Sequence, residues 1–175
     1  MVVELAAHAS PAVFDRLRQD VFTETDRHRR GELLRALATA RDVKQQTAAL
    51  ELMLDDRIDS RETRSVVFRS TEDINWTTAQ QFVRDHKDEL LRRIPSDSPV
   101  SGQAVLAYVF TEGCKADQRD EVADYVTRTF AGFPGGARTV RQAIEDMDQR
   151  LARGALIESE LRGWLGTPAT ARMPR

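Results

Sequence analysis

The fold class is indicated most clearly by residues 10–54, which read SPAVFDRLRQDVFTETDRHRRGELLRALATARDVKQQTAALELML. Ser10 and Pro11 together form a strong helix start, because serine caps the free amide groups and proline suits the first turn. Apolar side chains then recur at helical spacing, which predicts a first helix over 11–23 with an inner face of Val13, Phe14, Leu17 and Val21.

The remainder of this stretch predicts two more short helices. In the second, apolar residues share one face while arginines surround the rest: Leu33, Leu34, Leu37 and Ala38. Asp42 is placed to cap the third, whose expected inner face is Thr47, Leu50, Met53 and Leu54. Short helices joined by few-residue connections must bury their apolar stripes against their neighbours.

Helical periodicity continues along the chain, and no segment of useful length alternates polar and apolar residues as a strand does. We expect further helices within 58–70, from Asn75 or Thr77 to Ile94, near 100–112, near 118–132, after Pro134, and finally within 158–166. The sequence therefore predicts an all-α fold, an α-solenoid of eight or nine helices stacked as antiparallel HEAT-like pairs without a sequence repeat.

Composition limits the classes of protein to which the chain can belong. Its 175 residues suit one domain, and 41% hydrophobic with 31% charged residues is typical of a folded protein. We expect a helical domain over 1–166 and a mobile tail over 167–175. The formal net charge of -2 argues against nucleic acid or an anionic membrane as partner. The expected protein is soluble, cytoplasmic or periplasmic, and lacks a signal peptide. Basic residues are nearly all arginine, which favours a bacterial gene.

Candidates for chemistry are few. Cys114 is the single cysteine and has no convincing histidine partner for nucleophilic catalysis. His28 with Glu32, and His86 with Glu89, have spacings that place two side chains together on a helix. A third ligand is not evident for either pair, so surface or packing roles are the favoured alternatives. We predict no catalytic residue, no metal site and no cofactor in this chain.

The segment FPGGARTVRQAIEDM, residues 133–147, resembles a phosphate-binding loop before a helix. It lacks the Gly-Lys-Ser/Thr ending of nucleotide sites, so we interpret Pro134, Gly135 and Gly136 as a break between two helices. Arg138 falls in the first turn of the second helix, where its charge opposes the helix dipole. An anionic partner nearby and simple surface tolerance both account for it.

Several segments together resemble a known family: RGELLRALATARDVKQQTAALELML, FVRDHKDEL, CKADQRDEVADYVTRTFAGFPGGARTVRQAIEDM and the closing LRGWL. They resemble the C-terminal helical domain of zinc aminopeptidases of the aminopeptidase N type, including endoplasmic reticulum aminopeptidases, from about Val3 to Leu165. The most specific part is Gly136, Arg138, Gln142 and Glu145 ahead of a last short helix ending in Trp164 and Leu165. Gln80 and Lys87 stand where the family usually has aromatic residues.

The resemblance implies a piece, or a relic, of a larger metallopeptidase. In that family the zinc motif H-E-x-x-H and the substrate-binding G-x-M-E-N belong to an earlier catalytic domain, and neither occurs in this sequence. The helical domain closes over the catalytic domain and limits which peptides enter, so its implied partners are that domain and the peptide substrate. Arg138, assisted by Arg141, is the predicted substrate-binding group. A freestanding helical scaffold that binds a protein partner is the alternative, and a small enzyme with an unrecognised site is a third possibility.

Overall fold

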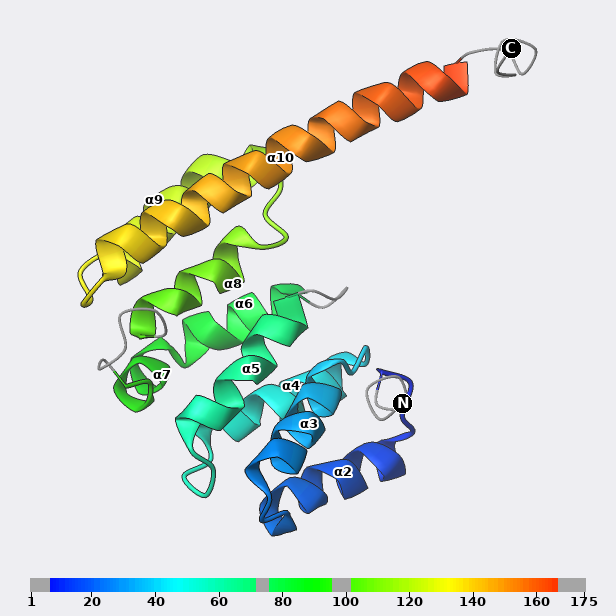
Figure 1. The fold of residues 1–175 in the computed structure, drawn as a ribbon, viewed down its shortest axis with the longest axis vertical. Coiled ribbons are helices and arrows are strands. Elements are labelled where there is room, and N and C mark those ends of the chain that lie inside the picture. Colours follow the sequence, from blue (N-terminus) through cyan, green and yellow to red (C-terminus); the bar gives the residue numbers. More distant parts are fainter. Residues whose placement is uncertain (1–6, 72–75, 96–101, 167–175) are drawn as a thin grey trace.

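The computed structural model describes residues 7–71, 76–95 and 102–166 (Figure 1). These residues form helices and contain no β-strand, which confirms the all-α prediction. The α-helices are α2 (Pro11–Thr23), α3 (Arg27–Ala38), α4 (Val43–Leu50), α5 (Ser60–Thr71), α6 (Trp76–Asp85), α7 (Lys87–Arg93), α8 (Ala107–Thr111), α9 (Arg119–Phe130) and α10 (Gly136–Gly166). Three short 3-10 helices are η1 (Glu51–Leu54), η2 (Gln103–Leu106) and η3 (Ala116–Gln118). The predicted tail over 167–175 lies outside the described residues.

Local capping sets the start of the first three helices. The Ser10 hydroxyl accepts a hydrogen bond from the Val13 amide at 3.4 Å, and α2 begins at Pro11 as predicted. The Asp42 carboxylate accepts from two amides of α4, each at 3.0 Å, which confirms the predicted cap. Asp26 caps α3 in the same way, through the Arg29 amide at 2.9 Å. Each cap satisfies amide groups that the helix itself leaves without partners.

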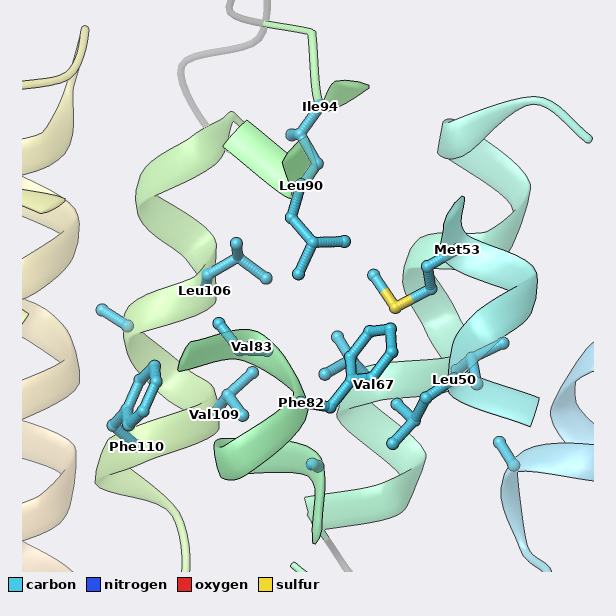
Figure 2. Packing of buried hydrophobic residues seen from close by; sticks show 14 of the residues in the cluster. Leu50, Met53, Val67, Phe82, Val83, Leu90, Ile94, Leu106, Val109 and Phe110 are labelled. Carbon is cyan, nitrogen blue, oxygen red and sulfur yellow. The ribbon is translucent and has the colours of Figure 1, made fainter. Parts of the chain in front are cut away.

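The helices follow one another along the long axis of the molecule, from α2 at one end to α10 at the other (Figure 1). α3 packs most extensively on α5, and α10 closes the far end of the stack against α8, α9 and η2. One continuous apolar core runs between them. Figure 2 shows its middle, where side chains from α4, α5, α6, α7 and α8 meet, including Leu50, Val67, Phe82, Leu90 and Phe110. The pairing of the helices as HEAT-like repeats stays a prediction.

The predicted single helix from residue 75 or 77 to 94 is wrong, because the chain forms α6 and α7 with a break at His86. His86 has φ -111° and ψ 18°, outside the helical region. Its amide donates to the Phe82 carbonyl at 3.0 Å and its carbonyl accepts from the Leu90 amide at 2.9 Å. The break therefore redirects the chain without losing these backbone bonds. Similarly, the helix predicted near 100–112 consists of η2 followed by α8.

Gln80 and Lys87, which stand where the resemblance implies aromatic residues, are both accommodated in the structure. The Gln80 side-chain amide donates to the carbonyls of Val109 and Phe110 at 3.1 and 3.2 Å. This polar side chain therefore links α6 to α8. Lys87 is half-buried at the start of α7, where its ammonium lies 3.6 Å from the Asp88 carboxylate.

The last predicted element is also wrong in its extent, because α10 is one helix of 31 residues, about 46 Å long. Neither Gly154 nor Gly163 adopts a positive φ, so neither ends the helix. The second half of α10 extends beyond the other helices (Figure 1). It leaves five large apolar side chains exposed: Leu156, Ile157, Leu161, Trp164 and Leu165.

Candidate functional site

The backbone conformation of the turn before α10 explains why residues 135 and 136 are both glycine. Gly135 has a φ of 72°, a conformation that other residues rarely adopt. The Gly136 amide donates to the Phe133 carbonyl at 2.7 Å, and a Cβ placed on Gly136 would lie 2.3 Å from the Phe130 carbonyl oxygen. The close approach of two backbone segments thus requires glycine, and the interpretation of this stretch as a helix break is confirmed.

The structure brings Arg138 and Arg141 together on one side of α10, one turn apart. Both side chains are exposed, whereas Val140, Ala143 and Met147 form the buried side of the helix. At about 100° per residue, the two arginines lie on the side of α10 that faces away from α8 and α9. Neither makes a hydrogen bond or ion pair with the part of the chain that the structure describes. Both are therefore accessible to a group from outside this chain.

The two histidine pairs differ in their surroundings. His28 Nε2 lies 3.4 Å from Glu32 Oε1, and both side chains are largely exposed. The His86 ring contacts the Phe82 ring in a tilted arrangement, with 4.6 Å between ring centroids. Glu89 accepts a hydrogen bond from Arg93 at 2.9 Å. His86 therefore has a packing contact at the α6–α7 break, and Glu89 is engaged by its own helix.

Within residues 7–71, 76–95 and 102–166, no group of three or more His, Cys, Asp or Glu side chains is placed to hold a metal ion. Cys114 is buried, and its thiol donates to the Lys115 carbonyl at 3.3 Å. Burial raises the pKa of this thiol, which disfavours the thiolate that a nucleophile would need. The helices in the same part of the chain also include none with the length and apolar character to span a membrane.

Three arginines join parts of the fold that are distant in sequence. Arg30 binds Glu62 through two hydrogen bonds of 2.7 and 3.0 Å, and this contact lowers the pKa of the Glu62 carboxyl. Arg119 likewise donates two hydrogen bonds to the Asp148 carboxylate, of 2.8 and 2.7 Å. Arg150 donates to the backbone carbonyls of Thr111 and Cys114. Sequence reasoning missed these contacts because the partners are separated by more than two dozen residues.

A family model described as the ERAP1-like C-terminal domain matches residues 1–149. No curated protein and no solved structure matches the chain. The matched range includes Arg138 and Arg141, and it ends before the protruding half of α10 with Trp164 and Leu165. Since the match spans most of the 175 residues, the chain belongs to the ERAP1-like C-terminal domain family.

Proposed function

We propose that this chain is the non-catalytic C-terminal helical domain of a zinc aminopeptidase, a bacterial metallopeptidase in which it closes over the catalytic domain and shapes the cavity that peptides enter. The family match over residues 1–149 carries this proposal. The zinc belongs to the catalytic domain, which supplies the hydrolysis. The contribution of the helical domain is shape, charge and closure, as in enzymes whose mobile domains sequester substrate.

The exposed row on α10 supports a role within a larger assembly. Ile157, Leu161 and Leu165 follow one another at steps of four residues, so they share one side of the helix. Apolar side chains gathered on a surface commonly mark a contact with another protein or domain. A freestanding scaffold that binds a protein partner would present the same three side chains to that partner.

Arg138 and Arg141 are the proposed contact for an acidic group of the catalytic domain or of the peptide. A guanidinium can donate two parallel hydrogen bonds to one carboxylate, and such pairs are stronger than neutral hydrogen bonds. A negative group there would also offset the unfavourable position of Arg138 at the positive end of α10.

Experiments on the full-length parent enzyme and its gene test the proposed function directly. The coding sequence upstream of this chain should encode H-E-x-x-H. The full-length protein should bind zinc and should release amino acids from peptides. Removing the helical domain should change the selection among peptides of different length more than the hydrolysis of a single-residue amide. An upstream sequence without the zinc motif, together with capture of a separate protein by this chain, would support the scaffold instead.

Arg138 is tested by replacement in that full-length enzyme. Arg138→Ala should alter kcat/KM for longer peptides while leaving the single-residue amide close to wild type, because only longer peptides reach beyond the catalytic centre. Arg153→Ala is the matched control, since Arg153 is also exposed on α10. If a folded Arg138→Ala enzyme has the wild-type kcat/KM for every substrate, Arg138 is a tolerated surface residue without a role in peptide selection.

A further inference from the structure

A repeat of seven residues runs along α10 from its buried half into its exposed half. Eight residues follow one another at alternating steps of three and four, as in the contact line of a coiled coil. The first four are Val140, Ala143, Met147 and Arg150, and the last four, here called the exposed seam, are Gly154, Ile157, Leu161 and Trp164. Since a straight helix drifts from this repeat by only about 20° per heptad, the eight positions lie along nearly one side of α10.

The chain itself covers the first half of this repeat. The three apolar members are buried where α10 packs on α8, α9 and η2, and Arg150 donates to two backbone carbonyls at the end of α8 and beyond it. The exposed seam begins where α10 extends past these helices (Figure 1). Ile157, Leu161 and Trp164 are exposed there, Trp164 although it takes part in another interaction of the chain. The side of α10 that is buried in the first half therefore continues as an exposed apolar side in the second half.

A repeat of this kind suits contact with another helix, whose side chains fill the spaces between its own. The rest of the molecule restricts the direction of that helix when it is α10 of a second copy. In a parallel pair the first halves of both helices would also face one another, so α8, α9 and η2 of the two copies would occupy the same space. In an antiparallel pair only the exposed halves meet, because each extends past the other helices of its own copy (Figure 1).

The exposed seam is complementary to itself in the antiparallel direction. A two-fold axis near residue 159 places Gly154 opposite Trp164 of the second copy, and Ile157 opposite Leu161 of the second copy. Gly154 leaves room for the large ring, because a Cβ added there would meet no heavy atom within 4 Å. A parallel pair would instead set glycine against glycine and tryptophan against tryptophan. The order of small and large residues therefore favours the antiparallel pair.

We propose that this chain self-associates through the exposed seam as an antiparallel dimer with two-fold symmetry. Each copy contributes the same surface, as in most homodimers. The exposed seam spans only about 15 Å of each helix, so the dimer should be weak and should form at micromolar to millimolar concentrations. The exposed seam lies beyond residues 1–149, which match the family, and the proposal does not depend on the aminopeptidase role.

The same pairing brings like charges together at its centre. Glu160 flanks the exposed seam, and the two-fold axis places it beside Glu160 of the second copy, with an offset of about 3 Å along the helix axis. Glu158, on the other flank, accepts a hydrogen bond from Arg162 of its own helix. Added salt should therefore strengthen the dimer, because it screens the repulsion between the two Glu160 carboxylates.

Sedimentation velocity of the 175-residue chain, from about 5 to about 500 µM, covers the range expected for a weak interface. The wild type should change from monomer to dimer across this range. Leu161→Lys should raise the dissociation constant at least about tenfold, because it places a charge in an apolar layer. Leu156→Lys is the matched control, since Leu156 is also exposed on this half of α10 but lies off the exposed seam, and it should dimerise as the wild type does.

A charge exchange at Glu160 tests the two-fold pairing itself. Glu160→Lys alone again brings like charges together, so its dissociation constant should stay close to that of the wild type. A mixture of this variant with a fluorescently labelled wild type should form mixed dimers about two- to fivefold more tightly than either chain pairs with itself, the size of an exposed ion pair. Fluorescence anisotropy of the labelled chain measures the difference.

Three results would overturn the proposal. The first is a monomer at every concentration, and the second is equal dimerisation of the wild type and a Leu161→Lys chain with a native circular dichroism spectrum. The third is a mixed dimer with Glu160→Lys that is no tighter than the wild-type dimer, which would exclude the antiparallel pairing about residue 159. If Leu161→Lys unfolds, the concentration series and the charge exchange still decide the question.

Discussion

Gly136 is a residue whose missing side chain determines how two helices meet. Gly136→Ala would bring a Cβ within 2.3 Å of the Phe130 carbonyl oxygen, so the turn between α9 and α10 must shift. We expect the free energy of unfolding to fall by about 1–3 kcal/mol, as for other overpacked sites. Urea denaturation followed by circular dichroism measures the change.

Gly154→Ala is the matched control, because Gly154 is helical and a Cβ added there would meet no heavy atom within 4 Å. This replacement should stabilise the chain by about 0.5–1 kcal/mol, since alanine loses less backbone entropy than glycine in a helix. Similar effects at the two positions would contradict the close contact at Gly136.

Asp55 links stability to pH. Hydrogen bonds from the Arg57 side chain and amide lower the pKa of the Asp55 carboxyl from 3.8 to about 2. The unfolded chain binds this proton more readily, so the contribution is complete above the unfolded pKa of 3.8 and is lost as the pH falls through the folded pKa of about 2. Urea midpoints measured across this acid range should decline less steeply for Asp55→Asn than for the wild type. Parallel declines would show that Asp55 is not responsible.

At the scale of elements, α10 consists of two halves with different environments. The first half packs on α8, α9 and η2 through Val140, Ala143 and Met147. The second half leaves its large apolar side chains exposed and extends past the other helices (Figure 1). The first half therefore contributes to the core, and the second half is available to a partner.

Replacing one apolar residue in each half separates these roles. Met147 is 1% exposed and Leu161 is 53% exposed. Met147→Ala should lower the free energy of unfolding by about 2–5 kcal/mol, because it leaves a cavity in the core. Leu161→Ala should change it by less than about 0.5 kcal/mol. Thermal or urea unfolding of the two variants tests this, and a large loss for Leu161→Ala would mean that the second half of α10 packs on the chain itself.

At the scale of the whole molecule, we make a prediction about zinc binding and catalysis. The purified 175-residue chain should neither hold one zinc ion per chain nor release amino acids from peptide amides, because the expected zinc motif is not in its sequence. Metal analysis after gel filtration and an aminopeptidase assay with added zinc measure both properties. Turnover that a chelator abolishes would contradict this prediction and favour the third class, a small enzyme with its own site.

Much of the fold was predictable, because helix starts and periodicity are local properties. Ser10 with Pro11 and the Asp42 cap are such local signals, and both helices begin where expected. His86 is predicted to lie within a continuous helix, because its spacing from Phe82 and Leu90 is helical. Its conformation shows that periodicity of side chains does not report a local change in backbone angles.

In the candidate site, too, some features could be predicted from the sequence and others depend on packing. The sequence pointed to Arg138 and Arg141 through their position at a helix start, and the structure shows both to be exposed. The exposed seam of α10 was not predicted, because it depends on how far the other helices reach along α10, which packing decides.

The order of residues was enough to establish helices, their caps and the family resemblance, since each depends on neighbours within a few positions or on a motif. Tertiary structure alone decided that Arg119 reaches Asp148, that Gly136 meets the Phe130 carbonyl, and that the second half of α10 extends beyond the other helices (Figure 1). These features depend on contacts between residues that are distant in sequence or on the path of the backbone. They exist because burial of the apolar core fixes how the helices pack, and the side chains that meet at their surfaces follow from that packing.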